Sequence, residues 1–312
     1  MLKYTIKRFA LMLLTLFAVI LIAFIIIRYI PGSLLDDPNL TDDARAVIVA
    51  AHMEGQPLHT QFLSYIHRIF RYGDFGTSRI VEPGVPVFGI ISRRLPVTAA
   101  INAAALLLAL PLGTLLAVTA ALGRGKISGK AVNFMSVVLV SVPSFVLATL
   151  LRYFIAFRLD LLPILYIPGG GFFEQARSLI LPVLALAVAP TALIIRLLRA
   201  ELVETKNTDF YQFAAAKGLS RSAAMRRHAL PYSTIPLIPV IALMFTDVLA
   251  GSLVVERVFS IPGMGGILID SVLTRDLDLA LAVIIFFTVA ELLVLFIADV
   301  LLAVIDPEIK FS

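Results

Sequence analysis

The sequence contains 312 residues, of which 60% are apolar, and its formal net charge is +5. Average soluble domains contain only about 45–50% apolar residues, so this composition excludes an ordinary soluble protein and predicts a membrane protein. The sequence contains no cysteine, which excludes a disulfide scaffold, a cysteine-ligated metal site and thiol catalysis. Charges in a membrane protein act through their positions, so the net positive charge does not predict a nucleic-acid partner.

The first predicted membrane span is the apolar run 9–29, which is long enough to cross a hydrocarbon layer of about 30 Å. A cleaved signal peptide is the alternative, but the length of the run and the lack of a small-residue cleavage site favour a retained helix. Five further apolar runs predict spans at 97–122, 132–157, 179–198, 235–255 and 279–305. We therefore expect an all-α, polytopic protein with six transmembrane helices, folded as one domain over residues 1–312.

Prolines within these runs are expected to bend or break the spans, at Pro111, Pro143, Pro182 and Pro236.

The positions of the lysines predict the orientation of the chain. They occur in alternate connecting segments of the six-span topology, at Lys3, Lys7, Lys126, Lys130, Lys206, Lys217 and Lys310. By the positive-inside rule these segments are cytoplasmic, so both termini are expected inside a multi-pass membrane protein. The acidic segment 31–96 is then an extracytoplasmic cap.

The longest inner connection, 199–232, is predicted to form two short helices around a glycine. Asp209 and Gln212 have the spacing of a capping box, and Lys217 followed by Gly218 suits the end of the first helix. An aromatic and small apolar surface is expected on this helix, formed by Phe210, Tyr211, Phe213 and Ala214.

The second helix of this connection is expected to begin at Ser220 as its cap and to end at Pro231. Its side chains are mostly basic, through Arg221, Arg226, Arg227 and His228. Two interpretations follow from the physical chemistry alone. The pair of helices inserts into a groove on a cytoplasmic protein partner, or it lies on anionic membrane lipid.

The stretch DFYQFAAAKGLS at 209–220, followed by RHALP at 227–231, resembles the EAA loop of binding-protein-dependent ABC importer permeases, in the form found in the dipeptide and oligopeptide branch. Two positions depart from the general motif, since Gln212 stands where it has glutamate and Phe213 where it has alanine. The similarity extends over nearly the whole chain, through residues 31–33, 73–78, 143–145, 162–163, 168–171, 251–252, 256, 259, 262–265, 275–276, 299 and 305–307.

This resemblance implies a type I (MetI-like) ABC importer permease of the bacterial inner membrane. Such a permease translocates dipeptides or oligopeptides by alternating access and is not itself an enzyme. It also implies a heterodimer with a second homologous permease, two cytoplasmic ATPases that bind ATP and Mg²⁺, and an extracytoplasmic peptide-binding protein. The permease itself is expected to bind no cofactor. Relatives of the same architecture handle nickel, glutathione or cationic peptides, so these substrates remain open.

The resemblance further implies that the inner loop docks into an ATPase subunit and that Gly218 permits the bend between its helices. The implied docking residues are Gln212, Phe213, Ala214, Ala215, Ala216, Lys217, Gly218, Leu219, Ser220, Arg227 and His228.

Three charged residues fall inside predicted spans, where charge is costly and tends to face protein or water. Asp247 lies midway along its span and is predicted either to line the translocation path, attracting a peptide amine, or to form a structural ion pair. Arg152 and Glu291 lie nearer helix ends, where snorkelling is the alternative to a role in the path. All three are also candidate relay groups of an ion-coupled secondary transporter. That second hypothesis leaves the loop 199–232 unexplained.

The sequence lacks several catalytic and binding motifs. The segment 125–130 is one residue short of a phosphate loop and lacks its hydroxyl, so the chain is expected to have no ATP site of its own. Gly263-x-Gly265 indicates a tight turn rather than a dinucleotide site. No serine within a span is paired with a base, which argues against an intramembrane hydrolase. No convincing metal ligand set is formed by the outer histidines His52, His59 and His67.

Overall fold

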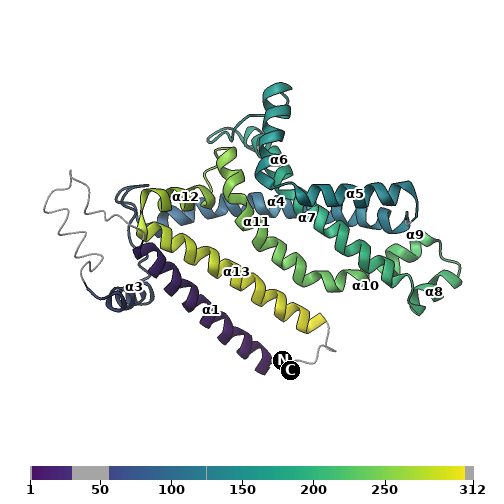
Figure 1. Cartoon of the computed structure of the whole chain (residues 1–312), viewed down its shortest axis with the longest axis horizontal. Coiled ribbons are helices and arrows are strands. Elements are labelled where there is room, and N and C mark those ends of the chain that lie inside the picture. Colours follow the sequence, from purple (N-terminus) through teal and green to yellow (C-terminus); the bar gives the residue numbers. More distant parts are fainter. Residues whose placement is uncertain (1, 30–55, 124, 306–312) are drawn as a thin grey trace. The chain divides into compact units, whose positions relative to one another are not determined.

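A computed structural model describes residues 2–29, 56–123 and 125–305 of the protein (Figure 1). Regular structure in these ranges is helical, and the only β-type pairing described there is an isolated bridge between Thr77 and Pro86. The expected all-α class is therefore confirmed. The predicted residues 31–33, His52 and Lys310 lie outside the described ranges.

Four described helices contain stretches long and apolar enough to cross a membrane: α1 (Leu2–Tyr29), α4 (Val87–Leu122), α7 (Phe172–Thr205) and α13 (Leu277–Ile305). Each contains one of the predicted spans and extends beyond it at one or both ends. A fifth predicted span corresponds to α11 (Ile238–Val258). The total of six membrane crossings stays a prediction.

The predicted span 132–157 is broken in the structure. Helix α5 (Ile127–Ser141) is followed by α6 (Ser144–Leu151), which continues into π-helical turns at Arg152–Arg158, and the two halves are bent by 99°. Pro143 between them has an extended backbone, with φ −58° and ψ 138°. Proline disfavours helical geometry in the residue before it, and the bend predicted at this proline is confirmed. Pro182, by contrast, lies inside the continuous helix α7.

The chain divides into two compact units, which we describe separately. The first comprises residues 1–96 and 266–293, and the second comprises residues 97–265 and 294–312. The expectation that the whole chain is one domain stays a prediction.

The core of the first unit is built by α1, α13 and α3 (Leu58–Tyr72), with the short helix α12 (Met264–Thr274) preceding α13. Phe24 of α1 is buried against two aromatic rings of α3, with ring centroids 5.4 Å from Phe62 and 5.9 Å from Tyr65. Helix α3 ends at Gly73, whose φ of 63° is left-handed and allows its N–H to bond back to Ile69. This amphipathic helix is thereby packed onto the apolar spans.

In the second unit, α7 is the central helix and contacts α5, α6, α10 (Leu230–Thr234) and α11 (Figure 1). Small residues allow close approach of its neighbours, as membrane helix packing requires. A Cβ built on Gly113 of α4 would lie 2.8 Å from the side chain of Ile194 in α7. Apolar side chains on the remaining faces are exposed, among them Phe134, Phe154 and Phe157. An exposed apolar surface of this kind suits contact with lipid.

Candidate functional site

The inner loop folds into short helices around a glycine, as its sequence predicts. Helix α8 (Asp209–Ala216) is separated from α9 (Arg221–Ala224) by Gly218, whose φ is +89°. The hydroxyl of Ser220 accepts a hydrogen bond from the N–H of Ala223 at 3.3 Å and caps α9. The chain continues through π-helical turns at Met225–Ala229 into α10 (Leu230–Thr234).

The predicted capping box between Asp209 and Gln212 is replaced by a different contact. Asp209 is the first residue of α8 and not the residue before it. The side-chain amide of Gln212 donates instead to the carbonyl of Asn207 at 3.4 Å. The helix therefore begins one position earlier than the motif implies.

Helix α8 has two different faces, whereas its sequence was expected to present one apolar surface. Tyr211 and Ala214 are buried, with exposed fractions of 8% and 6%. Phe210 and Phe213 are exposed, at 41% and 62%. Residues three apart share a face of an α-helix, so each pair lies together. One face fixes α8 to the protein and the other faces outward.

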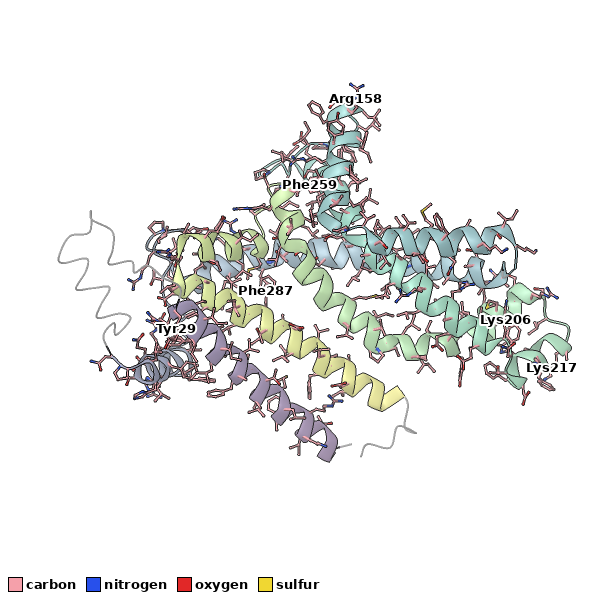
Figure 2. All side chains as sticks on the ribbon, in the orientation of Figure 1. Tyr29, Arg158, Lys206, Lys217, Phe259 and Phe287 are labelled. Carbon is pink, nitrogen blue, oxygen red and sulfur yellow. The ribbon has the colours of Figure 1, made fainter. Side chains whose placement is uncertain are left out.

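The loop is held to the ends of neighbouring helices by polar contacts. Figure 2 labels Lys206 and Lys217 in this part of the chain. Lys206 Nζ donates to the carbonyl of Ala121 near the end of α4 at 2.6 Å. The hydroxyls of Thr205 in α7 and Ser233 in α10 lie 2.8 Å apart and are buried. These contacts fasten the start of the loop to α4 and join the end of α7 to α10.

The outward surface of the loop combines aromatic and basic side chains. The rings of Phe210 and Tyr232 meet edge to face at 5.1 Å between centroids, and both are exposed. Lys217 Nζ lies 4.6 Å from the centroid of the Phe213 ring. Basic side chains on α9 and the turns after it are also exposed, at Arg221, Arg226, Arg227 and His228. This surface, which we call the docking surface, suits a partner groove with apolar pockets and acidic edges.

Most of the remaining implied docking residues are also exposed. Gln212, Ala216 and Gly218 are exposed, and Leu219 is half-buried. Ala215 belongs to α8, but its side chain lies outside the described part of the structure.

The charged residues of the predicted spans do not form a described common site. Arg152 is half-buried and its guanidinium donates to the carbonyl of Val258, the last residue of α11. This carbonyl has no partner within its helix, and a cation at a helix C-terminus is favourable. Glu291 is an exposed residue of α13. Asp247 belongs to α11, and its side chain lies outside the described part of the structure.

The outer histidines that are described do not assemble a metal site. His59 and His67 are both exposed on α3, and the ring of His67 meets that of Tyr72 at 6.0 Å between centroids. Within the described ranges, no group of three histidine, aspartate or glutamate side chains has metal-binding geometry.

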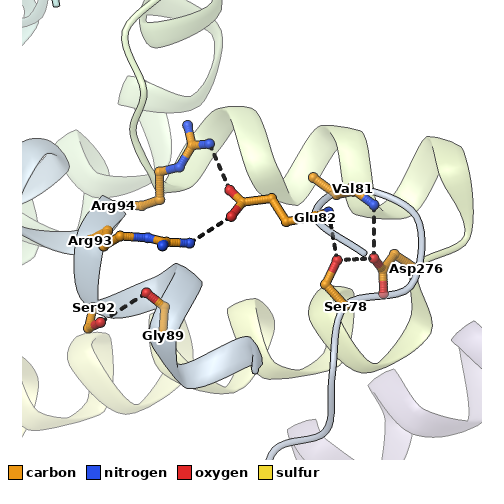
Figure 3. Close-up of polar contacts among 8 residues, drawn as sticks. All are labelled: Ser78, Val81, Glu82, Gly89, Ser92, Arg93, Arg94 and Asp276. Carbon is orange, nitrogen blue, oxygen red and sulfur yellow. Dashed lines mark hydrogen bonds and ion pairs between the residues drawn. The ribbon is translucent and has the colours of Figure 1, made fainter. Parts of the chain in front are cut away.

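A buried carboxylate in the first unit was not assigned a role from sequence (Figure 3). Asp276 is 1% exposed, and its Oδ2 accepts from the hydroxyl of Ser78 at 2.6 Å. The same oxygen accepts from three successive backbone N–H groups, those of Arg79, Ile80 and Val81, at 3.0, 3.1 and 3.2 Å. Asp276 thereby fixes the turn that leads into α4. Both segments were noted only as part of the family resemblance.

The same turn carries a partly buried ion-pair cluster. Glu82 binds Arg93 at 2.6 Å and Arg94 at 3.1 Å, and its backbone N–H donates to the hydroxyl of Ser78 (Figure 3). The turn is therefore fastened to α4 as well as to Asp276.

A second polar cluster joins α3 to the start of α13. Arg68 lies 3.6 Å from both Asp74 and Asp278. A Cβ built on Gly76 would lie 2.5 Å from Asp278, so only glycine leaves room for that carboxylate. Burial, and secondarily the charge of Asp278, raise the pKa of Tyr65 above its usual range.

These features define a class of protein: a helical membrane component with a folded loop, between two of its spans, that exposes aromatic and basic side chains. The chain belongs to the family described as binding-protein-dependent transport system inner membrane component, which matches residues 109–311.

Curated relatives match the chain over its whole length. A dipeptide transport system permease protein of Lactococcus lactis is 36% identical over 310 residues, covering 99% of this chain and 100% of that protein. One from Bacillus subtilis is 33% identical over 311 residues, covering 99% and 98%. An oligopeptide transport system permease protein of Escherichia coli is 34% identical over 313 residues, covering 100% of both chains.

Proposed function

We propose that this protein is the transmembrane permease subunit of an ATP-driven importer for short peptides, and that the loop 199–232 is its docking element for a cytoplasmic ATPase. The observation that carries this proposal is the docking surface: an exposed aromatic and basic face on a loop that is itself fastened to α4, α7 and α10. The names of the full-length relatives support peptides as the substrate.

The geometry of the loop favours a protein partner. A short helix that buries one face and exposes Phe213 can insert that ring into a partner groove, as helix-in-groove recognition requires. Because the other face of α8 is buried through Tyr211 and Ala214, a pull on the docked helix is transmitted to the spans and not lost in a flexible loop. Closure of an ATPase pair would then rock the spans between inward-facing and outward-facing states.

The complete importer in this proposal has five subunits, including this chain. A second homologous permease pairs with this chain, two ATPase subunits bind ATP and Mg²⁺, and an extracytoplasmic binding protein delivers the peptide. This chain contributes a single six-span domain with both termini in the cytoplasm, and segment 31–96 faces outward. The lysine positions support this orientation.

Asp247 is the residue we propose for the translocation path, because it is an acidic residue in the apolar helix α11. The contact of Arg152 with Val258 favours a structural role for that arginine. Loss of peptide uptake by an Asp247→Ala variant that still assembles would support the proposal, and normal uptake would reject it.

The docking proposal is tested by affinity purification of the tagged chain from gently solubilised native membranes, with mass spectrometry of the proteins that accompany it. We expect two ATPase subunits and a second permease. Phe213→Glu should release the ATPases, whereas Phe173→Glu, at an aromatic ring that is 72% exposed outside the loop, should retain them.

A backbone control sharpens this experiment. Gly218 and Gly84 both have left-handed φ, +89° and +80°, and neither has an atom within 4 Å of a built Cβ. Substitution by aspartate therefore strains both backbones equally, and only Gly218→Asp should release the ATPases. Recovery of the chain alone, with transport that survives ATP depletion, would support an ion-coupled transporter. If the loop substitutions weaken only the binding of the loop to anionic lipid, the membrane-surface role of the loop would be supported.

A further inference from the structure

A second buried carboxylate lies in the second unit, at the end of α11. Glu256 is 0% exposed. Its Oε1 accepts from the hydroxyl of Thr98 in α4 at 2.7 Å, and its Oε2 accepts from the N–H of Gly265 at 2.8 Å. The hydroxyl of Thr98 in turn accepts from the N–H of Met264 at 2.8 Å. One side chain and one hydroxyl thus hold two successive N–H groups of the turn after α11.

Two glycines of this turn are required by the closeness of the carboxylate and of α11. A Cβ built on Gly263 would lie 2.3 Å from Oε2 of Glu256, and one built on Gly265 would lie 2.4 Å from Cα of Leu253. A Cβ built on Gly266 meets no atom within 4 Å. The turn therefore packs directly against the Glu256 carboxylate as far as Gly265, whereas a side chain has space at Gly266.

Other contacts fasten the same end of α11. The carbonyl of Phe259 accepts from the N–H of Tyr166 at 2.9 Å, and the carbonyl of Val258 accepts from Arg152. The N–H of Ile261 donates to the carbonyl of Glu256 at 2.8 Å. Phe259 marks this end of the helix in Figure 2.

The opposite end of α11 is connected directly to the docking loop. Helix α10 passes through a 3-10 turn at Ile235–Leu237 into α11 without an intervening loop. Prolines remove backbone donors along this path, at Pro231, Pro236 and Pro239. Displacement of the docking loop therefore bends the start of α11 more readily than its fastened end.

We propose that Glu256 and Thr98 form a clasp that holds the turn 261–265 on α4 throughout the transport cycle, so that α11 pivots at this end while its other end follows the docking loop. This inference rests on the proposed importer function, since it assigns that loop as the source of movement. Glu256 is a positioning residue in this scheme and contacts no substrate.

The clasp is tested in the complex purified with the tagged chain and reconstituted in nanodiscs. The chain contains no cysteine, so a single Met264→Cys substitution at a 0% exposed position reports opening of the turn to a maleimide. Labelling is measured on this chain without nucleotide and with ATP plus vanadate. We expect none in either state, whereas Leu273→Cys, at a side chain that is 72% exposed, should label in both.

Two further variants then compare loss of the Thr98 hydroxyl, in Thr98→Val, with its retention, in Thr98→Ser. Thr98→Val should raise labelling at position 264 by about tenfold, as expected when buried groups lose a hydrogen-bond partner, and Thr98→Ser should leave it unchanged. In proteoliposomes with trialanine as the probe, Thr98→Val should also raise the ATP hydrolysed per peptide imported, although ATPase subunits stay bound. Labelling of Met264→Cys in the vanadate state alone, or equal labelling with valine and serine, would overturn the clasp.

A second pair of variants keeps the test decisive if Thr98→Val fails to assemble. Gly263→Ala places a methyl group against the Glu256 carboxylate, and Gly266→Ala adds the same group where there is space. Only the former should increase labelling. Absence of ATPases from the unsubstituted complex would instead contradict the proposed function and leave the local clasp to be judged from labelling without nucleotide.

Discussion

At the scale of single residues, the turns at two helix ends are held by buried carboxylates that accept backbone N–H groups. Asp276 holds the turn 78–81 in the first unit, and Glu256 holds the turn 261–265 in the second. Each is also bonded to a hydroxyl, that of Ser78 or Thr98. A charged acceptor makes such hydrogen bonds about twice as strong as neutral ones, which suits turns that must keep one conformation.

Asp276→Ala should destabilise the protein, because it leaves three N–H groups and the hydroxyl of Ser78 without their acceptor. A single buried group without a partner costs about 1–3 kcal/mol. Thermal unfolding of the detergent-solubilised chain should show a lower midpoint for Asp276→Ala and a smaller decrease for Asp276→Asn, which keeps an acceptor oxygen. Glu204→Ala, at an exposed carboxylate, serves as the control. Equal midpoints for the two alanine variants would show that the Asp276 contacts contribute nothing.

Tyr65 should make stability fall at alkaline pH. Burial raises the pKa of Tyr65 in the folded protein, whereas the unfolded chain releases this proton near its usual pKa of about 10. The contribution of Tyr65 to the free energy of unfolding is therefore fully present below that pH, and it is lost as the pH rises above it. The measurement is the unfolding midpoint from pH 8 to about 11 for the original chain and Tyr65→Phe. The unfolding midpoint of Tyr65→Phe should fall less over this pH range than that of the original chain. The midpoint of Tyr72→Phe, at an exposed ring, should fall as much as that of the original chain.

At the scale of elements, the loop 199–232 and the broken span behave as their sequences predict because both depend on local backbone chemistry. Gly218 supplies a left-handed residue, Ser220 supplies a cap, and Pro143 ends a helix. The division of α8 into a buried and an exposed face was not predicted correctly. All four of its apolar side chains were expected on one surface, and only packing against the neighbouring helices selects Tyr211 and Ala214 as the buried pair.

The break at Pro143 should depend on the proline. Spin labels at cysteines replacing the exposed residues Phe134 and Phe154 lie on opposite sides of the 99° bend. For the bent segment the backbone separation is about 20 Å, and for a straight helix it is about 30 Å, from a rise of 1.5 Å per residue. We expect Pro143→Ala to shift the distance distribution toward the longer value, since alanine removes the restriction on the preceding residue. An unchanged distribution would mean that packing against α7 alone maintains the bend.

At the scale of the whole molecule, the lysine positions predict that the docking surface faces the cytoplasm and that α3 faces outward. Cysteines at the exposed positions of Tyr72 and Lys217 test this with a membrane-impermeant maleimide on intact cells. Tyr72→Cys should label at once and Lys217→Cys only after permeabilisation. The reverse pattern would invert the topology and rule out docking to a cytoplasmic ATPase through this loop.

The sequence by itself determined the membrane class, the positions of the long helices, the bend at Pro143 and the two short helices around Gly218 in the inner loop. Hydropathy, proline and glycine act through neighbours along the chain, so these features need no tertiary contact. The two carboxylate-held turns were decided only by the tertiary structure. Asp276 meets Ser78 across 198 positions and Glu256 meets Thr98 across 158, and a hydrogen bond between such distant residues exists only once the helices have packed.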